Sequence, residues 1–365
     1  SRALVESAAT GDMYQLHSLD CFADTDTQEK TVSSYKLNYR DGGFDETELL
    51  ETVRQLVSEY PDILLVVSSG FESKPEQLNK LEQLAPVIAN RTDTIRMFKD
   101  PKLLQELLVD NDIKHPETLF SLNECGDHYL LKQAGAEGGG HVKWLTETCH
   151  KQTSDYYYQQ YIAGDVMSAI VLSNGTEARI TGINYQLQLE KNDKHPFLYL
   201  GAISTNDIDD RVLYEIQRIV TVFTQEADLR GLYGLDFIKT ESGEIFLLEI
   251  NPRPPASFEL HEQVPSLFEQ HLVCFGGKSI EGDLAKTKMY KGYAILYMEQ
   301  DIIVHANTVW PEWVKDRPGN NEMIMAGVPV CSVFATADSV NLVKTKLFDQ
   351  LDQIESQILT LQNAA

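Results

Sequence analysis

Hydrophobic positions along residues 1–92 follow two kinds of spacing. In some segments apolar residues recur every three or four positions, as in an amphipathic helix; in others they form short continuous runs, as in a buried strand. The expected helices are Arg2–Thr10, Asp45–Tyr60 and Lys74–Ala85, and the expected strands are Gln15–Asp20, Ile63–Val67 and Pro86–Ala89. Strands that alternate with helices predict a parallel, doubly wound α/β domain.

After residue 92 the pattern changes to short strands and turns with fewer helices. One helix is expected over Asp93–Asn111, interrupted at Pro101 because proline breaks the helical hydrogen-bond pattern. The later expected helices are Ile208–Asp228 and Ser339–Leu361, and the expected strands are Tyr129–Lys132, Tyr156–Tyr161, Val166–Ser173, Glu177–Gly182, Tyr293–Met298 and Pro329–Phe334. Asn174-Gly175, between two of these strands, is a strong hairpin signal.

The most specific polar pattern lies on two further strands, joined at Ser242-Gly243. If these residues form a two-residue turn, Asp236 lies directly opposite Glu249, and Asn251 shares their face because side chains alternate along a strand. The neighbouring positions are apolar, which implies burial and argues against a surface hairpin with ordinary acids. Two opposed, buried carboxylates repel each other, and a divalent cation with oxygen ligands would resolve that conflict.

A lysine followed by a run of glycines forms a second pattern. Lys132 ends an expected strand and precedes a loop in which Gly138, Gly139 and Gly140 are consecutive. Such a loop can hold phosphates with one positive charge and several backbone amides. The spacing fits neither the P-loop nor the dinucleotide fingerprint, and glycine-rich hairpin loops also occur for purely structural reasons.

A tyrosine-rich strand gives a third and weaker pattern. The strand Tyr156–Tyr161 carries Gln159 and Gln160 and is followed by Ile162. The main-chain groups of such a strand could meet the edge of an adenine ring. The alternative is a core strand with no ligand.

Composition and charge exclude several function classes. The chain has 31 Lys and Arg against 55 Asp and Glu, a net charge of −24, which repels nucleic acid and anionic membranes. The same negative charge repels ATP, so a nucleotide site in this chain would need local cations and a metal. The five cysteines are scattered without a CxxC or Cys/His cluster, which predicts reduced thiols in a cytoplasmic protein rather than a disulfide framework or zinc site. No apolar run is long enough to span a bilayer.

Taken together and in this order, the patterns from Asp100-Pro101-Lys102 to Asn251-Pro252-Arg253 resemble the ATP-grasp superfamily. The resemblance implies an ATP-grasp fold of two α+β subdomains. By this resemblance the residues that contact ATP would be Lys102, Lys132, Gly138, Gly139, Gly140, Gln159, Gln160 and Ile162. The metal ligands, for one or two Mg²⁺ or Mn²⁺ ions, would be Asp236, Glu249 and Asn251. Arg253 and Lys132 would act in catalysis, with Arg253 steadying an acyl phosphate.

The resemblance also sets the expected domain organisation. A parallel α/β domain that precedes the ATP-grasp fold would cover residues 1–92. The ATP-grasp domain would cover 93–275, with a smaller subdomain at about 113–161, and a small α+β extension would cover 276–365. One departure concerns ribose, which many members bind with a glutamate where this chain has Val166; Asp165 could substitute.

Less specific segments resemble small single-chain ATP-grasp ligases of one-carbon coenzyme pathways, similar to tyramine–glutamate ligase. These segments are 1–9, 19–27, 181–186 and 310–313. The resemblance implies glutamate ligation in the synthesis of a methanofuran-, methylofuran- or pterin-type coenzyme. Simpler readings exist, because Trp310 and Trp313 could be packing residues and the aspartates Asp20, Asp24 and Asp26 could serve only to solvate a loop.

The expected function is therefore that of an ATP-dependent carboxylate–amine ligase. The partners would be a small-molecule carboxylate and an amine, with a homodimer left open. Three alternatives remain: a carboxylase or carbamoyl-phosphate-type enzyme, a kinase, and a nucleotide-binding scaffold without turnover. The presence of both lysines, the three metal-ligand positions and Arg253 argues against the scaffold.

Overall fold

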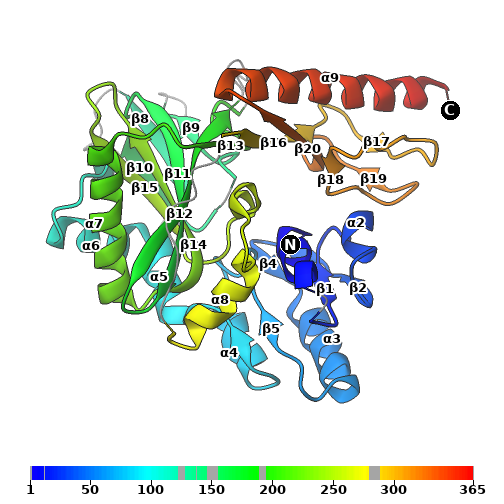
Figure 1. Cartoon of the computed structure of the whole chain (residues 1–365), viewed down its shortest axis with the longest axis horizontal. Coiled ribbons are helices and arrows are strands. Elements are labelled where there is room, and N and C mark those ends of the chain that lie inside the picture. Colours follow the sequence, from blue (N-terminus) through cyan, green and yellow to red (C-terminus); the bar gives the residue numbers. More distant parts are fainter. Residues whose placement is uncertain are drawn as a thin grey trace.

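The computed structural model describes residues 2–11, 13–121, 128–136, 138–145, 155–188, 195–278 and 288–364. Figure 1 shows the N-terminal segments gathered on one side of a large sheet, with the C-terminal helix lying along the other end of that sheet. The described residues contain no helix long and apolar enough to cross a membrane. Cys125 and Cys149 fall outside the described ranges.

All six elements expected before residue 92 are present. They are α1 (Arg2–Ala8), which continues into the short η1 (Ala9–Gly11), then β1 (His17–Asp20), α3 (Glu46–Glu59), β5 (Leu65–Val66), α4 (Glu76–Glu82) and β6 (Val87–Ile88). The sequence analysis missed α2 (Thr25–Gln28), β2 (Ser33–Lys36), β3 (Tyr39–Arg40) and β4 (Gly43–Phe44), which are too short for a periodic signal.

The strands of this region are parallel but are divided between separate sheets. β1 pairs in parallel with β2, and β5 pairs in parallel with β6. The apolar faces of α3 and α4 supply a local core that includes Leu49, Val53 and Leu78. The α/β class of this region is therefore as expected, whereas one continuous doubly wound sheet is not found among the described strands.

The expected interruption at Pro101 separates two helices, α5 (Thr92–Lys99) and α6 (Pro101–Asp110). Asp100 caps α6 by accepting hydrogen bonds from the backbone amides of Lys102 and Leu103. A small antiparallel sheet follows, ordered β7-β10-β8-β9. Its strands are β7 (Thr118–Leu119), β8 (Tyr129–Gln133), β9 (Lys143–Trp144) and β10 (Tyr156–Gln160).

The centre of the molecule is an eight-stranded sheet ordered β15-β14-β11-β12-β13-β16-β20-β18. Its strands are β11 (Asp165–Asn174), β12 (Ala178–Gln188), β13 (Tyr199–Thr205), β14 (Arg230–Lys239), β15 (Ile245–Asn251), β16 (Tyr290–Tyr297), β18 (Val314–Lys315) and β20 (Pro329–Ala337). The sheet crosses the expected domain boundary at residue 275, because β13 pairs with β16. The three-part division of the chain remains a proposal.

Helices cover both faces of this sheet (Figure 1), which explains why β11 is buried over residues 167–174 and carries a continuous apolar run at 169–172. Ala169 and Val171 pack into the core beneath α7 (Asp210–Ala227), while Ile170 and Leu172 pack on the side of α8 (Leu267–Phe275). The C-terminal helix α9 (Val340–Ala364) packs against β16 and β20 (Figure 1). The remaining short elements are β17 (Ile302–Ile303), β19 (Met323–Ile324) and η3 (Ala256–His261).

The β14–β15 hairpin confirms one expectation and corrects another. Thr240 and Glu244 pair at its end, where the Thr240 amide lies 2.9 Å from the Glu244 carbonyl, so the loop has one residue more than the expected two-residue turn. A β-bulge between Asp236 and Phe237 compensates for that extra residue. Asp236 therefore still lies opposite Glu249, although the predicted turn was wrong.

Candidate active site

The hairpin brings the three predicted metal ligands together on one face. Asn251 donates a hydrogen bond from Nδ2 to Oδ2 of Asp236, over 3.1 Å. Gln186, on β12, donates from Nε2 to Oδ1 of the same aspartate, over 2.8 Å. Asp236, Glu249 and Asn251 thus form a connected polar group rather than three separate surface side chains.

A lysine that the sequence analysis missed joins this group. Lys99, the last residue of α5, pairs with Oε1 of Glu249 and donates to Oδ1 of Asn251 over 2.7 Å. Its side chain is only 6% exposed. A lysine at the end of an amphipathic helix gives no local signal of such a role, and the sequence analysis placed the first phosphate-binding lysine three positions later.

The pKa values of the two opposed carboxylates shift in opposite directions. Burial, and next the negative charge of Glu249, raise the pKa of Asp236 to about 7. Burial also acts to raise the pKa of Glu249, but the ammonium groups of Lys99 and Lys132 outweigh it and hold that pKa below its ordinary value. Within the described part of the chain, Glu249 therefore makes an ion pair with Lys99, whereas Asp236 makes none.

The small sheet presents the residues predicted for the phosphates and the adenine. Lys132, on β8, donates from Nζ to Oε1 of Gln159, on the neighbouring β10, over 3.0 Å. Gln159 is buried, Gln160 is exposed, and Ile162 is half-buried. All four line one cavity together with the metal-ligand group.

The glycine loop packs closely on the segment that precedes β13. The Tyr199 amide donates to the Gly138 carbonyl over 2.9 Å. Gly139 has a φ of +73°, and a Cβ atom there would lie 2.0 Å from the carbonyl oxygen of Phe197. Gly138 and Gly139 line the cavity, whereas Gly140 is not part of its lining.

Arg253 is held by the N-terminal part of the chain. Its Nε donates to Oε1 of Glu72, whose other oxygen accepts from the amides of Gly70, over 2.8 Å, and Phe71, over 3.0 Å. The Glu72 side chain is 4% exposed and that of Arg253 18%. A charge-assisted contact of this kind fixes the direction of the guanidinium group.

Besides Gly140, two further predicted positions lie outside the cavity lining. The ammonium of Lys102 lies 5.2 Å from the centre of the Phe120 ring, and Lys102 is not part of the cavity lining. Asp165, considered for ribose, pairs with Lys239 over 3.2 Å and also lies outside the lining, whereas Val166 is part of it. The roles of Lys102 and Asp165 stay predictions.

The cavity has a volume of about 1690 Å³ and extends well beyond the metal-ligand group. A second part of the lining, called the acidic end below, includes Asp20, Asp24, Glu259 and Asp316, with Arg2 among them. Burial, together with the charges of Asp316, Asp20 and Asp26, raises the pKa of Asp24 to about 8. The lining therefore carries Lys99, Lys132 and Arg253 beside the two carboxylates of the hairpin, whereas the acidic end has four acids and one arginine.

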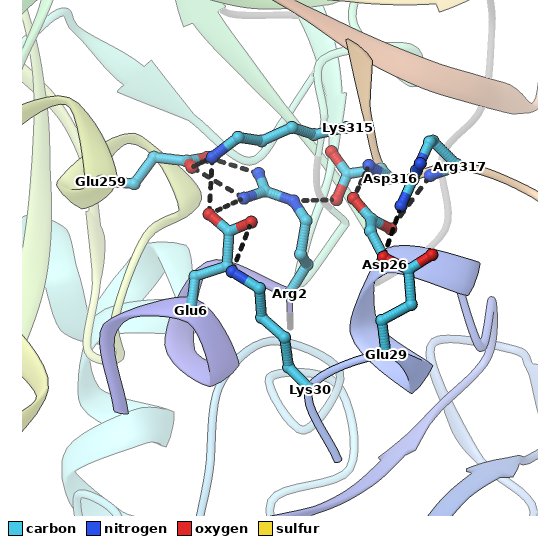
Figure 2. A network of polar contacts seen from close by, with 9 residues as sticks. All are labelled: Arg2, Glu6, Asp26, Glu29, Lys30, Glu259, Lys315, Asp316 and Arg317. Carbon is cyan, nitrogen blue, oxygen red and sulfur yellow. Dashed lines mark hydrogen bonds and ion pairs between the residues drawn. The ribbon is translucent and has the colours of Figure 1, made fainter. Parts of the chain in front are cut away.

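Arg2 organises the wall at the acidic end, as Figure 2 shows. Its guanidinium donates two hydrogen bonds to Glu259, over 2.8 and 2.6 Å, and one to Asp316, over 2.7 Å. A further contact joins it to Glu6 over 3.0 Å. These partners come from α1, η3 and the segment after β18, so one buried side chain connects three parts of the chain.

Residues 99–257 match the family model of the ATP-grasp domain. This chain contains an ATP-grasp domain. The match covers both carboxylates, Asn251, Lys132, the glycine loop and Arg253. The predicted ATP-grasp fold is confirmed, and the domain match supports the predictions of an ATP-dependent enzyme and of ATP with Mg²⁺ as its cofactors.

Solved structures show the same fold at low sequence identity. The biotin carboxylase domain of Hydrogenobacter thermophilus 2-oxoglutarate carboxylase, with MgADP and bicarbonate, has a TM-score of 0.72 and 12% identity, over 95% of this chain and 86% of that one. Carboxyaminoimidazole ribonucleotide synthase of Aspergillus clavatus, with ATP, has a TM-score of 0.68 and 16% identity, over 97% of this chain and 96% of that one. L-amino acid ligase of Bacillus licheniformis has a TM-score of 0.64 and 12% identity, over 92% of this chain and 96% of that one. No curated protein matches the sequence.

The donor set suits a hard divalent cation. Among the described residues no group of three His, Cys, Asp or Glu side chains is placed to hold a metal. The ATP-grasp site offers two carboxylates and an amide oxygen, the ligand type that Mg²⁺ uses alongside phosphates and water. The raised pKa of Asp236 marks a place where added positive charge would be stabilised.

Proposed function

We propose that this ATP-grasp protein is a ligase that activates a substrate carboxylate with ATP and transfers the acyl group to an amine. The observation that carries the proposal is the convergence of Asp236, Glu249, Asn251, Lys132 and Arg253 on a single cavity. Such a set can hold a metal–nucleotide complex and a developing negative charge at the same place.

Bound Mg²⁺ would offset the charge of the transferred phosphoryl group. A carboxylate oxygen of the substrate attacks the γ-phosphorus, the bond to the bridging oxygen breaks, and ADP leaves. Lys132 holds phosphate oxygens, and Arg253 orients the resulting acyl phosphate. The amine nitrogen then attacks the acyl carbon, phosphate leaves with the C–O electron pair, and the amine loses a proton.

The acidic end of the cavity favours an amine over bicarbonate as the second substrate. Asp20 repels an anion, and the raised pKa of Asp24 marks a place where the positive charge of an ammonium group would be stabilised. The volume also leaves room beyond a nucleotide, because pockets for a single small ligand hold about 300–1,000 Å³. This is the observation that separates the ligase from the carboxylase alternative.

We propose glutamate as one candidate acid and an aromatic or furan-type amine as one candidate acceptor, in the synthesis of a one-carbon coenzyme. The support is the sequence resemblance described above. The likeness in fold to L-amino acid ligase is compatible with a carboxylate–amine reaction.

The test is a screen of phosphate release over pairs of acids and amines, with hydroxylamine as a general trap. A ligase releases phosphate when acid and amine are both present, and hydroxylamine yields a hydroxamate. Lys132→Met serves as the inactive control, with an expected loss of about 2–4 kcal/mol of transition-state stabilisation. A stable phosphorylated product without an amine would indicate a kinase, and ATP binding without release for any acceptor would indicate a scaffold.

A further inference from the structure

The ammonium group of Lys99 lies where a metal ion bound by Glu249 and Asn251 would be expected. It contacts Glu249 and Asn251 through the carboxylate and amide oxygens that the proposed function assigns to the metal. The lysine side chain is buried, so this position is not one conformation of a mobile surface side chain. Asn251 in turn contacts Asp236, which links all three ligands to the same cation.

An ammonium and a divalent ion compete for such a site. The ammonium and the divalent ion need the same oxygens of Glu249 and Asn251. Bound side by side at these oxygens, the two positive charges would repel each other. A free divalent ion would therefore have to displace Lys99 and leave a buried ammonium without its carboxylate, which is costly. ATP changes this balance, since its phosphates offer the ammonium a second anionic partner.

We propose that Lys99 keeps the metal site closed to free divalent cations and opens it only when a nucleotide is bound. In the free protein its ammonium holds Glu249 and Asn251 in place. When a metal–nucleotide complex binds, the ammonium moves from the carboxylate to phosphate oxygens. Lys99 is thus a positioning residue that couples metal entry to nucleotide entry, which matters in a chain of net charge −24 that would otherwise attract divalent ions. The proposal rests on the metal site of the proposed function.

The test measures Mn²⁺ binding by electron paramagnetic resonance on the whole chain, with and without ADP. Wild type should bind Mn²⁺ weakly alone and about tenfold or more tighter with ADP. Lys99→Met should bind Mn²⁺ about tenfold tighter than wild type when no nucleotide is present, and ADP should add little further. Adding Glu249→Gln to Lys99→Met should abolish the gain, which places the ion at this site.

Lys114→Met is the matched control. Lys114 also pairs with a glutamate of the β14–β15 hairpin, Glu244, over 2.5 Å, but at the exposed end of the hairpin. The substitution makes the same change in net charge, so a tenfold gain in this variant would show a general electrostatic effect and overturn the proposal. Thermal melting confirms that each variant is folded, and Lys99→Gln replaces Lys99→Met if the latter does not fold.

The outcomes separate this inference from the proposed function. If wild type and Lys99→Met bind Mn²⁺ equally without nucleotide, Lys99 is only a structural counter-ion and the inference is wrong, even if turnover is normal. If wild type binds free Mn²⁺ as tightly as it does with ADP, the inference also fails, whether or not the variants fold. If no Mn²⁺ binds under any condition, the metal site of the proposed function fails as well.

Discussion

Arg253 and Glu72 form an ion pair between segments that lie 181 positions apart. Glu72 is buried and accepts two backbone hydrogen bonds in addition to the one from Arg253, so its carboxylate is rigidly placed. The arginine that we assign to the acyl phosphate is therefore aimed by the N-terminal part of the chain. This gives that part of the molecule a role in positioning chemistry as well as in lining the cavity.

Glu72→Gln should lower kcat/KM by up to about 100-fold, because a misplaced guanidinium no longer meets the reacting oxygens. Nucleotide affinity should change little, since Glu72 contacts Arg253 and the amides of Gly70 and Phe71, and none of these is assigned to ATP. Steady-state phosphate release and an ADP titration measure the two quantities. Glu76→Gln removes an exposed ion pair with Arg96 and is the control. Wild-type kcat/KM in Glu72→Gln would show that Arg253 needs no such anchor.

Arg2→Met should destabilise the folded chain by about 3 kcal/mol, because the buried carboxylate of Glu259 loses both hydrogen bonds from the guanidinium and keeps a longer contact to Lys315, over 3.7 Å. The Arg2 side chain is 3% exposed and that of Glu259 is 10% exposed. Urea unfolding measures the change. The exposed Arg96 makes ion pairs with Glu76 and Asp93, and Arg96→Met should stay close to wild type. Equal effects of the two substitutions would mean that the Arg2 network adds no more than surface pairing.

Because its pKa is raised, Asp24 should make the free energy of unfolding fall as pH rises, the opposite of an aspartate whose pKa is lowered. Its pKa rises on folding from 3.8 to about 8, so between these values the folded chain binds more protons than the unfolded chain. The contribution of Asp24 to stability is then greatest at low pH and is lost as pH rises towards 8.

Asp24→Asn should remove this contribution. The difference in melting temperature between the variant and wild type should be small at about pH 5 and should grow in favour of the variant by about pH 8. Melting curves across this range provide the measurement. A constant difference, or one that shrinks as pH rises, would contradict the assigned pKa.

Gly139→Ala should weaken ADP binding more than Gly138→Ala does. Both residues have positive φ, at +73° and +74°, so both variants carry similar backbone strain. Only at position 139 would the new Cβ meet a neighbour, the Phe197 carbonyl at 2.0 Å, and such overpacking costs about 1–3 kcal/mol. The loop should then sit away from the cavity, and a fluorescence titration with ADP would detect it. Equal affinities in the two variants would show that the contact with residue 197 does not hold the loop.

The opposition of Asp236 and Glu249 was predicted from a two-residue turn, and it holds because the β-bulge offsets the longer loop that is present instead. The loop length was not predictable, because Gly243 at a φ of +81° allows a three-residue loop that looks the same in the sequence. The bulge that restored the pairing depends on packing around Phe237 and left no mark in the apolar pattern.

The residues that escaped prediction act over long sequence distances. Lys99 meets Glu249 across 150 positions, and Arg2 meets Asp316 across 314. Neither has a periodicity or motif that points to its partner. Lys102 is the opposite case: the family resemblance predicted that it contacts ATP, but in the structure its ammonium lies over the Phe120 ring.

The most direct test of the Mg-ATP site compares the melting of wild type and Asp236→Asn with and without Mg-ATP. The raised pKa of Asp236 means that its charge is unfavourable in the free protein, so the variant should be no less stable than wild type alone. Mg-ATP at about a hundred times its Kd should add about 2.7 kcal/mol of stability to wild type and clearly less to the variant. A variant that is badly destabilised alone, yet stabilised by Mg-ATP as much as wild type, would show that Asp236 is structural and that the metal site lies elsewhere.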